Sequence, residues 1–196
     1  MKLFNRIFKV KIRFFIQALL LTGSLLIFFT SCTKEEKPAP KLEIGQDYEG
    51  GIIFYLDDSG QHGLICASYD QSSALPWSNG VNSITNVTGS DIGTGKANTE
   101  AIVAAQGAGS YAAQICNDLD INGYHDWYLP SKSECFTMYF NLKTMKKIGH
   151  FTDAIYWSST EASLNNAYSQ YSNDGYPPNG GYYKNTPQFV RAIRSF

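Results

Sequence analysis

Short runs of β-branched and aromatic residues, bounded by glycine and polar turn residues, recur along this chain and are typical of strands. Two of them flank the turn at Asp57–Gly60, and the later ones predict an antiparallel sheet. The predicted strands are residues 51–56, 63–68, 154–160, 167–172, 181–184 and 188–196. Residues 70–98 are rich in Ser, Asn, Gly and Thr and predict a long irregular loop.

Apolar residues at helical spacing predict three helices. The first is capped by Asn98 and Thr99 and ends at Gly107. The second opens at Ser110 and continues to Leu119.

The third helix belongs to residues 122–139, around which we expect the domain to be organised. Ser131 and Glu134 fit a capping box, in which each side chain bonds a backbone N–H of the other residue. Trp127 and Leu129 share one side of the extended piece before the helix, so we expect the core to gather there. The predicted apolar face of the helix is Phe136, Tyr139, Phe140 and Leu142.

The first 31 residues have the features of a lipoprotein signal peptide. Five basic residues precede an apolar run from Phe14 to Phe29, and small residues precede Cys32. This run is shorter than the ~20 residues that a spanning helix needs, so we expect cleavage and acylation at Cys32. A retained transmembrane anchor is the alternative. The predicted segments are a signal peptide at 1–31, a lipidated tether at 32–41 and a domain at 42–196.

Net charge narrows the choice of partners. The signal peptide carries five of the 16 basic residues and none of the 17 acidic ones, so its removal leaves a formal charge of −6. Such a surface repels nucleic acid and anionic lipid headgroups, and we predict no nucleic-acid partner. Lys34-Glu35-Glu36 is similar to the acidic export signal of surface lipoproteins in some Gram-negative bacteria, although a generic charged linker would also explain it. The expected location is the outer membrane of a Gram-negative bacterium, with the domain exposed at the cell surface.

Six short blocks follow one another in order over nearly the whole predicted domain. They are Gly50–Phe54, Gly63–Ile65, Ile92–Thr99, Asn122–Ser131, Tyr156–Ser159 and Val190–Arg194. Together they resemble the Lcl C-terminal domain family, which is similar to C-type-lectin-like folds. The resemblance implies an α+β domain with two to three helices packed on a twisted, mostly antiparallel sheet. Many members carry one cysteine after the loop tryptophan and another at the end of the first helix, where this chain has Trp77–Gly80 and Ala105–Gly107.

Tyrosines and amides are interleaved near the C-terminus. Flat amphipathic rings beside amide groups suit stacking on sugar faces and hydrogen bonding to hydroxyls, although packing of the rings on the sheet would also explain them. The candidate ligand-binding residues are Tyr168, Tyr171, Asn173, Asp174, Tyr176, Tyr182 and Tyr183, together with residues 70–98. We expect a non-enzymatic, adhesin-like surface lipoprotein that binds a glycan or matrix polysaccharide. The alternative is a structural or protein-interaction subunit of an envelope assembly.

Patterns for catalysis and metal binding are weak, so we predict no enzyme activity, no cofactor and no metal. Cys66, Cys116 and Cys135 form no CxxC pair and have no zinc-ligand spacing to the histidines. A Cys116–Cys135 disulfide suits an oxidising compartment, and three buried thiols are the alternative. The run from Gly89 to Lys96 lacks the spacing of a phosphate-binding loop. Oxygen ligands for calcium would come from Asp57, Asp58, Asp91, Asn98 and Asp174, but we favour the interpretation that these are solvated turn residues.

Overall fold

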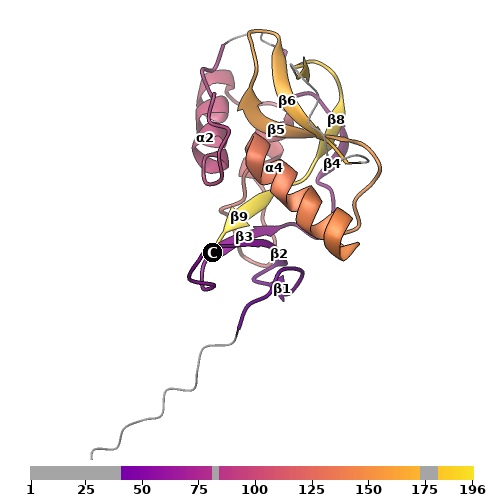
Figure 1. Cartoon of the computed structure of the whole chain (residues 1–196). Coiled ribbons are helices and arrows are strands. Elements are labelled where there is room, and N and C mark those ends of the chain that lie inside the picture. The colour runs from indigo at the N-terminus through magenta and orange to yellow at the C-terminus, as the bar shows by residue number, and fades with distance from the viewer. Residues whose placement is uncertain (1–40, 81–83, 173–180) are drawn as a thin grey trace, which may run out of the picture. The chain divides into compact units, whose positions relative to one another are not determined.

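Two curled β-sheets and a few helices form residues 41–80, 84–172 and 181–196, the part of the chain that the computed structural model describes (Figure 1). The architecture is mixed α+β, as predicted. The signal peptide, Cys32 and nearly all of the predicted tether lie outside these residues. Within the described ranges, no helix combines the length and the apolar character needed to cross a bilayer.

The first sheet has four strands, and each neighbouring pair is antiparallel. Its strands, in spatial order, are β1 (Asp47–Tyr48), β2 (Gly51–Leu56), β3 (Gly63–Cys66) and β9 (Ile193–Ser195). The predicted bounds of β2 are confirmed. Ile53 packs on one side of this strand, whereas Ile52 and Phe54 pack on the other. Because both sides are covered, the strand is apolar throughout and does not alternate with polar residues.

The second sheet has five strands, and only β5 and β8 in it are parallel neighbours. Its strands, in spatial order, are β4 (Ser72–Leu75), β8 (Gln188–Val190), β5 (Ile155–Glu161), β6 (Asn166–Tyr171) and β7 (Tyr182–Tyr183). The prediction of one strand over 188–196 is wrong. The chain leaves β8 at Arg191 and crosses to the other sheet, where β9 pairs with β3.

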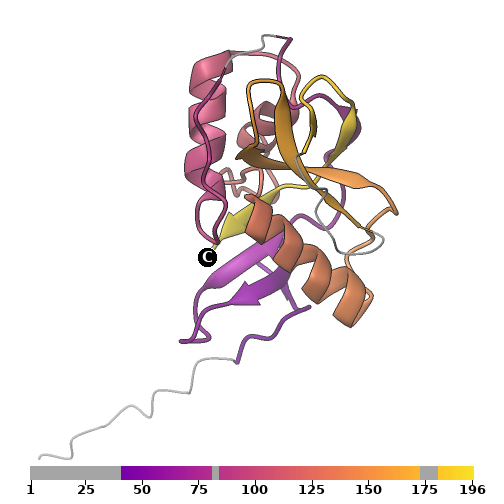
Figure 2. The same ribbon diagram turned by 45° about the horizontal axis from the view of Figure 1, so that its top comes forward.

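Four helical segments connect and cover the sheets. They are α2 (Gly95–Gln106), α3 (Ala112–Asn117), α4 (Lys132–Met138) and η1 (Tyr139–Lys146), a π-helix that continues α4. Figure 2 shows α4 lying between the two sheets, and it contacts β2 on one side and β5 and β6 on the other. The predicted capping box is confirmed, because the Ser131 hydroxyl accepts from Glu134 N while the Glu134 carboxylate accepts from Ser131 N.

Helix α2 begins before the predicted cap. Its N-cap is Thr94, and Asn98 and Thr99 lie buried inside the helix. The Asn98 amide donates to Gly89 O at 2.7 Å, while the Thr99 hydroxyl accepts from Leu129 N at 3.0 Å. These side chains therefore hold neighbouring segments against the helix. The predicted end at Gly107 is confirmed, and its φ of 68° explains the need for glycine.

The predicted apolar face of the third helix is partly wrong. Tyr139 and Leu142 are buried as expected, but Phe136 and Phe140 are 40% and 45% exposed. The buried positions of α4 are Glu134, Cys135 and Met138. Glu134 occupies the inner face because the capping box and the loop before α2 satisfy its carboxylate, and this rotates the two phenylalanines outward.

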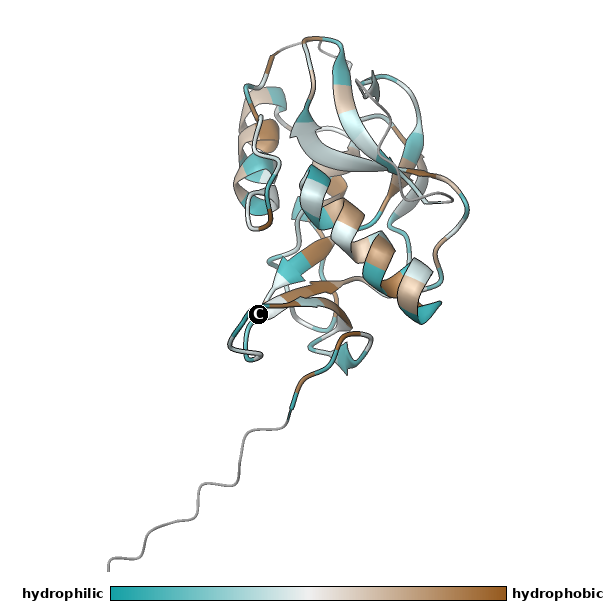
Figure 3. Ribbon diagram, in the orientation of Figure 1, coloured by the Kyte–Doolittle hydropathy of each residue, from teal (hydrophilic) through white to brown (hydrophobic). Residues whose placement is uncertain are grey.

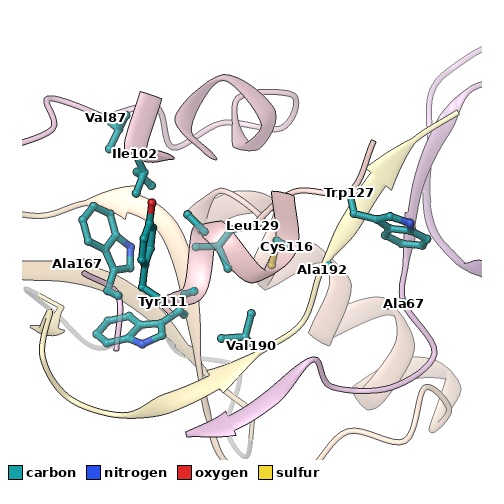
Figure 4. Packing of buried hydrophobic residues seen from close by; sticks show 14 of the residues in the cluster. Ala67, Val87, Ile102, Tyr111, Cys116, Trp127, Leu129, Ala167, Val190 and Ala192 are labelled. Carbon is teal, nitrogen blue, oxygen red and sulfur yellow. The ribbon is translucent and has the colours of Figure 1, made fainter. Parts of the chain in front are cut away.

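Two hydrophobic clusters fill the interior. The first contains Trp77, Trp127, Trp157 and Leu129, and Figure 4 shows part of it. The second contains Tyr128 with other aromatic rings. The extended piece before α4 thus sends Trp127 and Leu129 to one cluster, as predicted, and the intervening residue to the other.

Both clusters and both sheets are built entirely from residues between Leu42 and Phe196. A fragment that starts after Cys32 contains every core and sheet residue that the structure describes. This fragment, residues 33–196, is the form used in the experiments below.

Candidate ligand-binding surface

The register of β6 and β7 divides the predicted tyrosines between two faces of the sheet. Asn166 pairs with Tyr183, and Ala167 pairs with Tyr182. Opposed residues in an antiparallel pair point to the same face, and successive residues point to opposite faces. Tyr183, Asn166 and Tyr168 therefore share one face, whereas Tyr182 lies on the other with Ala167.

The face that carries Tyr168, Asn166 and Tyr183, hereafter the tyrosine face, has the features expected of a polar binding surface. Tyr183 is 67% exposed. The Lys132 ammonium lies 4.3 Å from the centre of the half-buried Tyr168 ring. Asn166 Oδ1 is buried without a hydrogen-bond partner among the described residues. Two rings, an amide and an ammonium group are thus brought together from β6, β7 and the start of α4.

The opposite face packs inward and is less suited to binding. Tyr182 contacts the first hydrophobic cluster, next to the fully buried Ala167. Tyr171 is half-buried and pairs with Ile155 of β5. The structure therefore separates Tyr171 and Tyr182 from the tyrosine face. Asn173, Asp174 and Tyr176, the other predicted ligand-binding residues, lie outside the described residues.

Residues 70–98 were predicted to form a long irregular loop, but their described part contains regular structure and is held by specific contacts. It includes β4 and the first turn of α2. A buried ion pair between Glu161 and Lys184 holds its middle part. The Glu161 carboxylate accepts from Thr85 N at 3.0 Å and from Asn86 N at 2.9 Å. Lys184 O accepts from Trp77 N at 2.8 Å.

The Lys184 ammonium also lies 4.7 Å from the Trp77 ring. Cation–π contact and charge pairing together compensate for burying an ammonium group. We conclude that the described part of the loop between β4 and α2 is a fixed element of the fold, which could support a binding surface by its rigidity.

A hydrogen-bonded pair of residues with amide side chains links the loop after Trp77 to the end of α2. Asn79 N donates to Gln106 Oε1 at 2.7 Å, and the Asn79 amide donates to Gln106 O. The two residues lie in Trp77–Gly80 and at the end of α2. The link between loop and helix is therefore made by amides.

The glycine-rich run before α2 lies against the carboxylate of Glu134. Glu134 Oε1 accepts from Gly93 N at 2.8 Å, and Oε2 accepts from Ser131 N at 2.7 Å. A side chain at Gly95 would collide with this carboxylate. Burial raises the pKa of Glu134, and the hydrogen bonds from Ser131 and Gly93 oppose that shift. The Gly93 N–H of this run is thus engaged by Glu134, which gives the run a structural role.

The three cysteines of the domain are free and buried. The predicted Cys116–Cys135 disulfide is not formed, because the two thiols belong to different hydrophobic clusters. Burial raises the pKa of Cys66 to about 12 and raises the pKa values of the other two thiols as well. All three are therefore protonated at neutral pH and serve as small apolar side chains.

The candidate calcium ligands are scattered. Asp57 Oδ1 accepts from Ser59 N and Gly60 N within its own turn. The amide of Asn98 is engaged with Gly89, as described above. Among the described residues, no group of three His, Cys, Asp or Glu side chains is arranged to hold a metal ion.

Two buried arginines were not identified as structural residues from the sequence. Arg191 pairs with Asp70 and donates to the carbonyl oxygens of Ala67 and Gly149 at 2.9 Å. Arg194 binds Asp126 at 2.6 Å and Glu49 at 3.0 Å. A charged residue within an apolar C-terminal run is the sequence signal for such pairing, although the sequence does not name the partner.

No family model and no curated protein matches this chain. Among solved structures, the chain is similar to a fimbrial protein from Bacteroides ovatus ATCC 8483, with a TM-score of 0.53 and 16% sequence identity. The superposition covers 78% of this chain and 48% of the fimbrial protein, so this chain corresponds to about half of that protein's length. At this identity the likeness concerns the fold alone, and it agrees with few helices on curled antiparallel sheets.

Proposed function

We propose that this protein is a non-enzymatic, lipid-anchored binding module on the surface of a Gram-negative outer membrane. We further propose that its ligand is a neutral glycan or matrix polysaccharide. The observation that carries the glycan proposal is the tyrosine face, where Tyr183, Asn166 and Tyr168 lie on one side of β6 and β7. Lipid attachment at Cys32 rests on the sequence of the N-terminal segment.

The chemistry of this face favours a sugar. An exposed phenol ring offers an apolar surface for the C–H face of a pyranose, and the neighbouring ammonium group of Lys132 can bond its hydroxyls. Lys132 partly neutralises the local surface of an otherwise acidic domain, but a single ammonium is insufficient for strong binding of a polyanion. A neutral glycan is therefore the preferred class, and its binding should depend little on salt.

Absence of catalysis and a C-type-lectin-like fold are further parts of the proposal. Three buried, protonated thiols leave no activated cysteine among the described residues. The ordered sequence blocks support membership of the Lcl C-terminal domain family, and the mixed architecture is compatible with it. Fold alone does not assign an activity.

A second candidate function is that of a subunit in an envelope assembly. The likeness to a fimbrial protein favours it. In that case the partner would be another protein, and an apolar contact surface would matter more than the tyrosine face.

A glycan array probed with the 33–196 fragment tests the first candidate. We expect binding to uncharged glycans and a loss of about tenfold or more in Tyr183→Ala, because stacking on one ring is worth roughly 1–3 kcal/mol on the base-stacking scale. Tyr69→Ala is the matched control, since Tyr69 is 70% exposed elsewhere on the domain.

Failure of the intact fragment to bind any glycan, or an equal loss in both variants, would reject the tyrosine face as a sugar site. The tyrosine face would also be rejected if the Tyr183→Ala variant still binds a sulfated glycan and salt abolishes that binding.

A further inference from the structure

The outward side of α4 and η1 carries an apolar surface. Phe136 and Phe140 are exposed, and their rings stack with centroids 5.8 Å apart. Met145, one turn further along, is 64% exposed. Ile148 follows at 38% exposed. These four residues, hereafter the aromatic patch, are not covered by any described part of the chain, and apolar bands on this helix are visible in Figure 3.

Lysines border the aromatic patch. Lys146 and Lys147 are exposed and form no ion pair with the described residues. Both line depressions at the end of η1 that also include Ile148. Lys143 is paired with Asp153, and Lys41 lies 3.6 Å from Glu43. These two pairs are neutral overall, so the remaining charges of Lys146 and Lys147 make the region locally basic. The domain as a whole is negatively charged.

The described chain begins beside this patch. Lys41 lines the same depression as Lys146 and Ile148, and the Ile148 side chain would lie 3.0 Å from a Cβ at Gly45. The segment 33–40 can span about 30 Å at most when fully extended. A lipid attached at Cys32 would therefore keep the Ile148 end of the aromatic patch within about that distance of the bilayer surface.

We propose that the aromatic patch docks on the surface of an anionic lipid layer, with Phe136, Phe140 and Met145 inserted among the headgroups. Lys146 and Lys147 would pair with lipid phosphates, as basic residues do beside an interfacial apolar face. This inference rests on the proposed lipid anchor, which supplies the proximity. It departs from the expectation from net charge that the domain avoids anionic lipid, because the proposal rests on the local charge of the patch.

Docking would orient the domain. Lys132 of the tyrosine face is at the beginning of α4, and the aromatic patch extends to the end of η1. Phe136 lies four residues, about one helical turn, from Lys132. Docking along the whole patch would therefore bring the Lys132 edge of the tyrosine face close to the lipid surface.

Co-sedimentation of the 33–196 fragment with vesicles tests the proposal without the covalent lipid. We expect binding to 3:1 phosphatidylethanolamine:phosphatidylglycerol vesicles and at least tenfold weaker binding to pure phosphatidylcholine. Phe136→Ser/Phe140→Ser should weaken binding about tenfold or more. Lys146→Gln and Lys147→Gln should each weaken it about fivefold, on anionic vesicles only.

Ile84→Ser/Leu164→Ser is the matched control, because both residues are exposed apolar side chains outside the patch. It should bind as the wild-type fragment does, and thermal unfolding should show that all variants remain folded. Equal binding by the patch variant and the control variant would overturn the proposal. A dimer in light scattering that Phe136→Ser/Phe140→Ser dissociates would also overturn it and assign the face to a second copy of the chain.

The anchor and the glycan site are tested separately. Loss of detergent-phase partitioning in full-length Cys32→Ala reports on the anchor alone, and the glycan array reports on the tyrosine face. Vesicle binding by the fragment requires neither the anchor nor the glycan site. If the fragment does not bind vesicles, the proposals of the anchor and of the glycan site are unaffected.

Discussion

The two hydrophobic clusters hold their polar groups in different ways. In the first, every tryptophan indole donates to a backbone carbonyl: Trp77 to Ser158 O, Trp157 to Leu75 O and Trp127 to Tyr124 O, at 2.9–3.0 Å. In the second, Tyr139 packs its ring centroid 4.9 Å from that of Tyr156, but its buried hydroxyl has no described partner.

This difference assigns the clusters different tasks. Two of the indole bonds join residues about eighty positions apart, so the first cluster ties the loop after β4 to the second sheet. The second cluster fills the space between α4 and the sheets mainly by ring packing. Substitutions in the first should disturb long-range connections, whereas those in the second should act through volume and local polarity.

The largest effect is expected from Trp157→Ala. It removes a fully buried indole and leaves Leu75 O without its donor, so we expect a loss of about 3–5 kcal/mol in the free energy of unfolding. Urea denaturation of the 33–196 fragment followed by circular dichroism measures this loss. A change below about 1 kcal/mol would contradict the central position of Trp157.

Lys184→Met should cost somewhat less, about 3 kcal/mol, because it leaves the Glu161 carboxylate buried without its cation. Hydrogen exchange at Thr85 and Asn86 should speed up, since their amides bond to that carboxylate. The double variant Glu161→Gln/Lys184→Met should recover part of the stability. If the double variant is less stable than the single one, charge burial is not the source of the loss.

The smallest effect, with the opposite sign, is expected in the second cluster. Tyr139→Phe removes a buried hydroxyl that lacks a described partner, so we expect the domain to become about 1 kcal/mol more stable. Tyr156→Phe is the control, because the Tyr156 hydroxyl accepts from Thr152 N and bonds Asp70 at 3.0 Å, and its loss should destabilise. A destabilising Tyr139→Phe would mean that this hydroxyl has a hydrogen-bond partner in solution.

Features encoded by neighbouring residues could be predicted from the sequence. The capping box of Ser131 and Glu134, the stop at Gly107 and the bounds of β2 all follow from local chemistry. The mixed architecture followed from the order of these elements. Trp127 and Leu129 were placed in one core because alternation along an extended piece is also a local property.

Features that depend on distant pairing could not be predicted. The division of the tyrosines between two faces depends on the register of β6 and β7, which is set by contacts with the rest of the sheet. Phe136 and Phe140 are exposed because a charged residue, Glu134, takes the inner face of α4 through partners in a remote loop. The separation of Cys116 from Cys135 arises from the two-cluster interior, which no local pattern shows.

The C-terminal residues have a consequence for the order of folding. Strand β8 lies between β4 and β5, and β9 adds the last strand to the other sheet. A chain that has not yet reached Gln188 lacks the strand that joins β4 to β5, and one that stops before Ile193 leaves β3 with a bare edge. Completion of both sheets must therefore wait until residues 188–195 have been synthesised, and a chain that lacks them cannot form both sheets as described.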